Sequence, residues 1–285
     1  MMNKLIRWPV AVMMLTLVLI LPGQPAAAKN TVYKLVKETS YDAADNLLEV
    51  KEYQYDKTGH DMGYVQYDEE KNTISSSVVL WEKNYTRKHV DVLDEKDAII
   101  TSEDSVLDDK GQLKKTTSAN SDKTFVSTTE YKYDKKGRLV KEIMTAKDLA
   151  DKKPHKTSSK VIYKYDKDGR LMNKEQIDEK KSTYYAEYEY DTDGNLVSVT
   201  SYAGKGGVKE TEVAYTYEKK NGVFLPKTES EYTCSTYDEE KKQVELEHPE
   251  LLTESSYDEN GNMIEKKSIN DGKTDIVTMY DYKEY

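Results

Sequence analysis

Acidic residues and glycines recur together along this chain, and the first chemistry that they suggest is calcium binding. Asp166-Lys167-Asp168-Gly169 and Asp191-Thr192-Asp193-Gly194 have the acidic spacing that begins a calcium loop. An EF-hand loop also needs glycine at its sixth position and glutamate at its twelfth. Counted from Asp191 these positions hold Leu196 and Tyr202, and the loop that starts at Asp166 fails in the same way. We therefore predict no metal site, because turn formation accounts for these acids.

The other residues that could carry chemistry are scattered. The four histidines follow no zinc-binding pattern, and they are His60, His89, His155 and His248. No serine lies in a Gly-x-Ser-x-Gly elbow. The single cysteine, Cys234, lies in a strand-like run and is interpreted as a structural thiol. We predict no catalytic residue, no cofactor and no enzyme activity. With 53 Asp and Glu, a carboxylate-dependent hydrolase stays the enzyme alternative, although no particular pair stands out.

The acids and glycines also mark an internal repeat of the form Tyr-x-Tyr-Asp-x-x-Gly-x-Leu. Three copies are nearly complete, and three more keep the aspartate and the glycine three residues later. The residues that we assign to this repeat are Asp56, Gly59, Asp108, Gly111, Tyr131, Tyr133, Asp134, Gly137, Leu139, Tyr163, Tyr165, Asp166, Gly169, Leu171, Tyr188, Tyr190, Asp191, Gly194, Leu196, Asp258 and Gly261.

Each residue type in the repeat has a physical role in a hairpin turn. Aspartate accepts hydrogen bonds from backbone amides that follow it, and glycine adopts a positive φ without steric cost. Where glycine is absent, Asp45 and Asn221 are predicted to take its place. The two tyrosines before the turn alternate, so they share one face, where the following leucine packs beside them. Opposite turns are predicted at Ala203–Gly207 and Asn270–Lys273.

The spacing of the repeat predicts an all-β fold. Many gaps between the turn acids are near 13 or 26 residues, which suits one strand with its turn or a full hairpin. We expect an elongated, twisted antiparallel β-meander of about 18 to 22 strands, or one curled into a partial shell. The longest interruption is expected at Ala146–Thr157, as an extended loop. A membrane barrel is the alternative fold, but it needs an apolar outward face that these Lys-, Tyr- and Asp-rich strands do not provide.

The first residues predict export. Lys4 and Arg7 precede the apolar run Val10–Leu21, and Ala26–Ala28 supplies a small-residue cleavage pattern. We expect a signal peptide at 1–28, a single domain at 29–285, a secreted or extracytoplasmic location and no membrane span after cleavage. Cleavage would take the formal charge from -10 to -12, which disfavours nucleic acid as a partner.

The repeat resembles the YD repeat, also called the RHS repeat, of bacterial secreted and surface proteins. The resemblance rests on the copies at Tyr131 and Tyr163 and on the near copy at Tyr188. It implies a hairpin architecture and an extracytoplasmic setting, and it transfers no catalytic residue. Large members of that family wind their hairpins into a shell around a cargo, and at 285 residues this chain is expected to be too short to close one.

These observations favour a non-catalytic scaffold or binding protein, secreted or associated with the cell envelope. Its partner is expected to be a protein or a glycan of the envelope. The alternative function is a glycan-binding module that stacks sugars on exposed rows of tyrosine, because the chain has 24 Tyr but only 2 Phe and 2 Trp.

Overall fold

The computed structural model describes residues 32–149, 155–233 and 251–284, and these residues form strands and their connections. Repeated Tyr, Val, Ile and Thr favour strands, and the turn residues between them set the strand lengths. The strands are β1 (Tyr33–Asp42), β2 (Leu47–Tyr55), β3 (Asp61–Tyr67), β4 (Thr73–Glu82), β5 (Arg87–Leu93), β6 (Ile99–Leu107), β7 (Leu113–Asn120), β8 (Phe125–Tyr133), β9 (Leu139–Asp148), β10 (His155–Tyr165), β11 (Leu171–Asp178), β12 (Lys181–Tyr190), β13 (Leu196–Tyr202), β14 (Lys209–Lys220), β15 (Val223–Thr233), β16 (Leu251–Tyr257), β17 (Met263–Asn270) and β18 (Lys273–Glu284).

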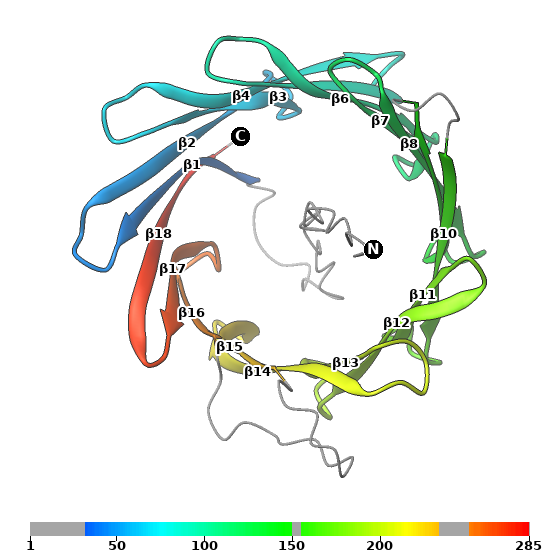
Figure 1. Ribbon diagram of the computed structural model, residues 1–285. Coiled ribbons are helices and arrows are strands. Elements are labelled where there is room, and N and C mark those ends of the chain that lie inside the picture. The colour runs from blue at the N-terminus through cyan, green and yellow to red at the C-terminus, as the bar shows by residue number, and fades with distance from the viewer. Residues whose placement is uncertain (1–31, 150–154, 234–250, 285) are drawn as a thin grey trace, which may run out of the picture. The chain divides into compact units, whose positions relative to one another are not determined.

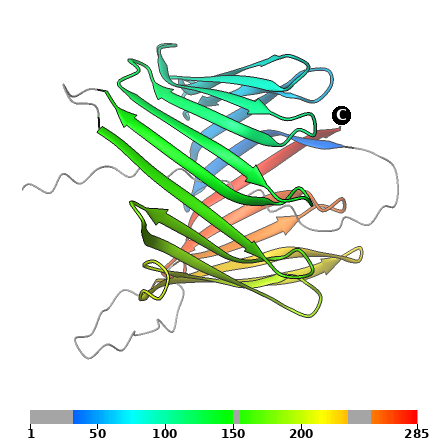
Figure 2. The same ribbon diagram turned by 90° about the vertical axis from the view of Figure 1, so that its right-hand side faces the viewer.

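The strands form one antiparallel sheet that closes on itself as an 18-stranded barrel. Each strand pairs with its neighbours in sequence, and β18 pairs with β1 from Tyr33 opposite Glu284 to Asp42 opposite Ile276. Figure 1 shows the strands in sequence order around the ring, and Figure 2 shows their tilt from the side. The prediction of an open sheet or partial shell is therefore wrong, and so is the expectation that the chain is too short to close. Closure leaves no unpaired edge between the first and last strands.

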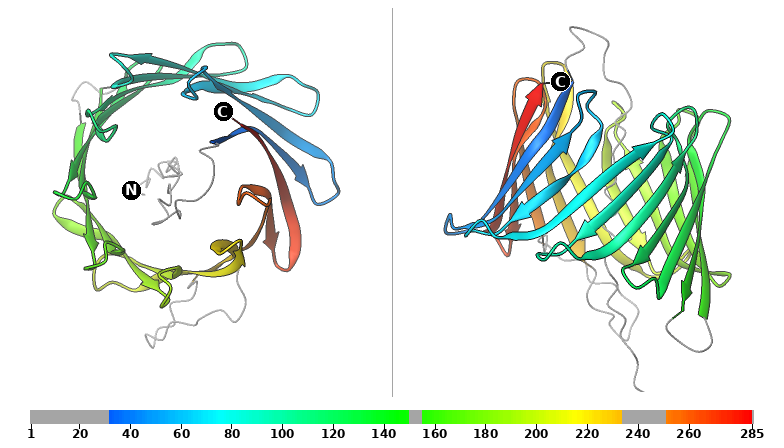
Figure 3. Two further views of the ribbon diagram at one scale, coloured as in Figure 1. Left: turned by 180° about the vertical axis from the view of Figure 1, so that it is seen from behind. Right: turned by 90° about the horizontal axis from the view of Figure 1, so that it is seen from above.

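The connections alternate between the two ends of the barrel, because the sheet is an antiparallel meander (Figure 3). The six turns with glycine three residues after aspartate all join an even-numbered strand to the next, so they lie at one end. We call these turns the glycine rim, and they span 56–60, 108–112, 134–138, 166–170, 191–195 and 258–262. At the other end, the turns that begin at Asp42, Asp68 and Asp94 are closed by the same backbone hydrogen bonds without glycine.

Positive φ angles occur where the turn chemistry requires them. Gly137 has a φ of 82° and donates its backbone N–H to the carbonyl oxygen of Asp134, at 3.0 Å. Asp45 and Asn221, which lack glycine's freedom, adopt φ angles of 64° and 51°. Beside each turn of the glycine rim the strand register shifts by one residue, so that Tyr133, for example, pairs with Leu139. A type I turn followed by a left-handed residue and a bulge produces this arrangement.

The two faces of the sheet differ in composition and in burial. One face carries the tyrosines of the repeat, such as Tyr131 and Tyr133, and we call it the tyrosine face. Most buried residues lie on it by register, and they are Ser77, Val79, Ser105, Ser159, Ala186, Leu196, Ser201 and Thr253. Side chains converge on the concave face of a closed sheet and diverge on the convex face. The tyrosine face is therefore the inner face of the barrel.

The strand bounds settle one further expectation and leave others untested. The segment Ala146–Thr157 is not a loop throughout, because β9 continues to Asp148 and β10 begins at His155, with the two paired there. The predicted signal peptide, Cys234 and His248 lie outside the described residues. Within the described part of the chain, no helix is long and apolar enough to cross a membrane.

Gly63 allows β3 and β4 to approach more closely than other residues would. Its φ is 121°, and a Cβ atom there would lie 2.0 Å from the carbonyl oxygen of Ser77. We expect Gly63→Ala to lower the free energy of unfolding by about 3 kcal/mol or more, because strain and backbone overlap add. Gly111→Ala is the matched control: its φ is 78° but nothing lies within 4 Å of the new Cβ. It should cost only about 1–2 kcal/mol. Equal losses in denaturant unfolding would contradict the close approach.

Candidate functional site

The carboxylates of the repeat are occupied by the turns that they initiate. Asp134 Oδ1 accepts hydrogen bonds from the backbone N–H groups of Lys136 and Arg138, at 2.8 and 3.0 Å. The backbone N–H of Arg138, and then its guanidinium, hold the pKa of Asp134 below its ordinary value. The aspartates at the other turns of the glycine rim accept the same bond from the residue four positions on. These acids are distributed around the rim, one to each turn, and they do not converge on a single site.

Two arginines connect neighbouring turns of the glycine rim. Arg138 forms an ion pair with Asp134 at 2.7 Å, and its guanidinium carbon lies 4.6 Å from the centre of the Tyr165 ring in the next hairpin. Arg170 repeats the pattern with Asp166 and Tyr190. An arginine over an aromatic face contributes about 0.5–1 kcal/mol at an exposed site and more when it is desolvated. The arginine of the motif therefore packs one hairpin against the following one.

Hydrogen bonds from tyrosine hydroxyls join neighbouring hairpins at the end of the barrel that carries the glycine rim. Tyr165 donates to the carbonyl oxygen of Leu139 at 2.6 Å, whereas the backbone pairing of β9 with β10 ends at Lys141 opposite Ile162. The hydroxyl thus satisfies a carbonyl that lies beyond the end of the β9–β10 ladder. The same bond occurs in four other pairs: Tyr55 to Leu35, Tyr133 to Leu113, Tyr190 to Leu171 and Tyr217 to Leu196.

The first tyrosine of each nearly complete repeat is packed in the barrel wall. Burial, and then a hydrogen bond to Glu142, raise the pKa of Tyr163 far above its ordinary value. Burial raises the pKa of Tyr131 and Tyr188 as well. These rows of rings are therefore part of the inner wall, and they do not form a freely exposed stacking surface.

A separate aromatic cluster lies where the β2–β3 and β4–β5 connections meet, at the same end as the glycine rim. We call it the aromatic rim cluster, and it consists of His60, Trp81 and Tyr85. The rings of His60 and Tyr85 are stacked, with centres 3.6 Å apart and planes within 8°. Trp81 meets each of them edge-on, with centres 5.8 Å away in both cases.

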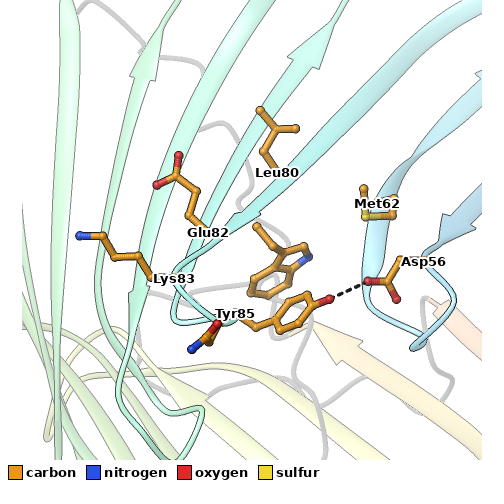
Figure 4. A pocket seen from close by; sticks show the side chains of 8 residues that line it. Asp56, Met62, Leu80, Glu82, Lys83 and Tyr85 are labelled. Carbon is orange, nitrogen blue, oxygen red and sulfur yellow. Dashed lines mark hydrogen bonds between the residues drawn. The ribbon is translucent and has the colours of Figure 1, made fainter.

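Hydrogen bonds hold the cluster in place. Tyr85 donates its hydroxyl to Asp56 Oδ2 at 3.1 Å, as Figure 4 shows. Trp81 donates its indole N–H to the carbonyl oxygen of Asp61 at 2.8 Å, and the His60 ring lies 2.7 Å from the hydroxyl of Thr58. Hydrogen bonds to the β2–β3 connection and to the first residue of β3 thus fix the three rings.

The cluster borders a shallow, open pocket of about 370 Å³. The pocket is lined by Asp56, Met62, Leu80, Trp81, Glu82, Lys83, Asn84 and Tyr85 (Figure 4). Leu80 and Tyr85 are exposed large side chains, at 52% and 41%. Sequence reasoning missed this site, because its residues follow no motif. The available signal was Trp81, the only tryptophan after residue 8, beside a turn without glycine.

The remaining titratable groups form no second site of this kind. His89 lies between two carboxylates, with Nδ1 2.8 Å from Asp104 and Nε2 3.2 Å from Asp91, and the bond to Asp104 raises its pKa most. This arrangement suits a surface ion pair on two neighbouring strands. Among the residues that the structure describes, no group of three or more His, Cys, Asp or Glu could hold a metal ion.

Comparisons with known proteins give likenesses of fold only. No protein-family model and no curated protein matches the chain. A porin-like protein from Bacteroides uniformis is 15% identical, with a TM-score of 0.46 over 89% of this chain and 99% of that one. The TcdB2-TccC3-Cdc42 structure is 14% identical, with a TM-score of 0.29 over 82% of this chain. This chain spans 15% of the length of that protein. The scores assign neither a family nor a function.

The link between hairpins can be tested with Tyr165→Phe. The variant keeps the ring but leaves the carbonyl oxygen of Leu139 without its hydroxyl partner, so the free energy of unfolding should fall by about 1 kcal/mol. The control is Tyr202→Phe, whose hydroxyl makes an exposed 3.3 Å bond to Glu187 and should matter little. Urea unfolding measures both. A loss in Tyr202→Phe as large as that in Tyr165→Phe would contradict the proposed role of the hydroxyl.

Because the turn aspartates have lowered pKa values, we predict that the folded protein loses stability in acid. Their folded pKa values are lowered, for example at Asp134 and Asp166 from 3.8, by hydrogen bonds from their own turns. A lowered folded pKa contributes stability that is present above the unfolded value and is lost as the pH falls through the folded value. The melting temperature should therefore drop below about pH 4. Asp166→Asn keeps a hydrogen-bond acceptor and should reduce this dependence. A melting temperature that is unchanged between neutral pH and about pH 2 would rule the explanation out.

Proposed function

We propose that this chain is a non-catalytic binding scaffold that is secreted or associated with the cell envelope. The observation that carries the proposal is that the polar groups of the repeat are bonded within the protein, whereas a cluster outside the repeat is partly exposed. The turn carboxylates are bonded within their own turns, and the hydroxyls of the second tyrosines of the repeat, such as Tyr165, are bonded to the neighbouring hairpin. The aromatic rim cluster, in contrast, stays partly exposed at one end.

The charged residues on the outer face of the barrel support contact with water. The outer face alternates charged residues with the buried inner positions, as at the exposed Glu130 and Lys132 of β8 and the exposed Glu187 and Glu189 of β12. Charges at such spacing keep a protein dispersed and discourage unwanted association between sheets. The export signal expected at 1–28 supports a location outside the cytoplasm.

A structural role for the rows of tyrosine has more support than a role in glycan binding. Stacking on a sugar needs an exposed ring face, whereas Tyr163 is packed beside Glu142 and Tyr165 beside Arg138. The scaffold proposal therefore assigns the repeat to the wall and assigns recognition to side chains outside the repeat.

The proposal is tested by expressing the full chain in a bacterial host and separating cytoplasm, envelope and medium. We expect the protein in the envelope fraction or the medium, with a mass that corresponds to cleavage after Ala28. Purified protein should leave chromogenic glycosides, esters and peptides unchanged. Retention in the cytoplasm with residues 1–28 uncleaved, or saturable turnover of any of these substrates, would contradict the proposal.

A further inference from the structure

We infer that the aromatic rim cluster is a binding site for uncharged carbohydrate, with a sugar ring stacked against Tyr85 and Trp81. This inference rests on the proposed binding function and names its ligand class. The cluster gathers residues from two connections, and it is the place in the described structure where three aromatic rings contact one another. Exposed aromatic rings offer an apolar face to the C–H groups of a sugar, while nearby polar groups bond its hydroxyls.

Three consecutive residues with side chains adopt the left-handed conformation at this site. Lys83, Asn84 and Tyr85 are consecutive residues with φ angles of 51°, 56° and 62°. The left-handed conformation costs about 1–2 kcal/mol for a residue with a Cβ atom, and the glycine rim uses glycine to avoid that cost. Strain of this kind persists where the surrounding structure imposes it and is concentrated at binding sites. Here it places the ring of Tyr85 over His60.

The interactions of the cluster keep its geometry rigid before any ligand arrives. His60 covers one face of Tyr85 at 3.6 Å, and the Asp56 carboxylate fixes the hydroxyl. Asp56 is itself held by the turn, because its Oδ1 accepts hydrogen bonds from the backbone N–H groups of Thr58 and His60. A rigid aromatic platform loses little conformational entropy on binding.

The charges around the pocket select an uncharged ligand. Asp56, Glu82 and Lys83 line it, so the acids outnumber the bases there and disfavour anions such as phosphate or uronic acid. A cationic ligand would compete with Lys88, whose ammonium already lies 5.5 Å from the Trp81 ring centre and pairs with Asp61 at 3.2 Å. The shallow, open form of the pocket suits a chain of sugars that passes over it, rather than a small ligand that must be enclosed.

Tryptophan fluorescence tests the inference directly. The chain has two tryptophans, Trp8 and Trp81. Protein cleaved after Ala28 keeps Trp81 as its single reporter, and Trp8→Phe gives the same single reporter in the full chain. Titration with neutral hexasaccharides of glucose, xylose, mannose and N-acetylglucosamine should give a saturable change with at least one of them. Tyr85→Ala on this background should weaken that binding about tenfold or more, because one stacking ring is lost.

Two further variants separate recognition from folding. Tyr85→Gly relieves the backbone strain, since glycine tolerates this φ, and should bind as weakly as Tyr85→Ala while remaining folded. Tyr202→Ala removes a partly exposed tyrosine that pairs with Tyr185 elsewhere on the barrel, and its affinity should equal that of the parent. Equal weakening by Tyr202→Ala, or unchanged affinity in Tyr85→Gly, would overturn the assignment of the site.

The absence of a saturable response to every neutral hexasaccharide would overturn the carbohydrate inference. If the protein is nevertheless exported and inactive toward the substrates above, the scaffold proposal stands without it. Cytoplasmic retention or turnover of those substrates would instead count against the scaffold proposal, whatever the fluorescence shows.

Discussion

The barrel depends on one local interaction, in which an aspartate carboxylate accepts hydrogen bonds from the backbone of its own turn. Asp134 binds the N–H groups of the residues two and four positions later, so the chain reverses within five residues. The residue three positions after the aspartate must then adopt a positive φ, which Gly137 does at 82°. Because the turn is stabilised by neighbours in sequence, it can form without help from the rest of the fold.

Beside four of the glycine-rim turns, a tyrosine hydroxyl joins one hairpin to the next. Leu139, for example, lies beyond the end of the β9–β10 pairing at Lys141, and its carbonyl oxygen accepts a hydrogen bond from the hydroxyl of Tyr165. Arg138 adds its own contact with the same ring. A tyrosine suits this role better than phenylalanine, because the ring packs in the wall while the hydroxyl reaches a polar partner. Five tyrosines of the described structure have this role, and they are Tyr55, Tyr133, Tyr165, Tyr190 and Tyr217.

The β4–β5 connection departs from this rule. It has no aspartate and no glycine, and it places three residues with side chains in the left-handed region, ending at Tyr85. Local features that oppose the general pattern of a protein are expected at functional sites. The departure brings the rings of Tyr85 and Trp81 against His60, whose own turn follows the rule. The regular turns support the wall, and this irregular connection carries the strongest candidate for recognition.

The amino-acid sequence by itself determined the turns, the alternation of the tyrosines and a strand number within the expected 18 to 22. These features depend on hydrogen bonds and side-chain directions within a few residues of each other. Tertiary structure alone decided that the sheet closes, because closure joins Ser40 to Thr278, and no local pattern specifies such a pairing. It also decided the contact of His60 with Tyr85, since that contact depends on the register of three strands and on the tilt that closure imposes.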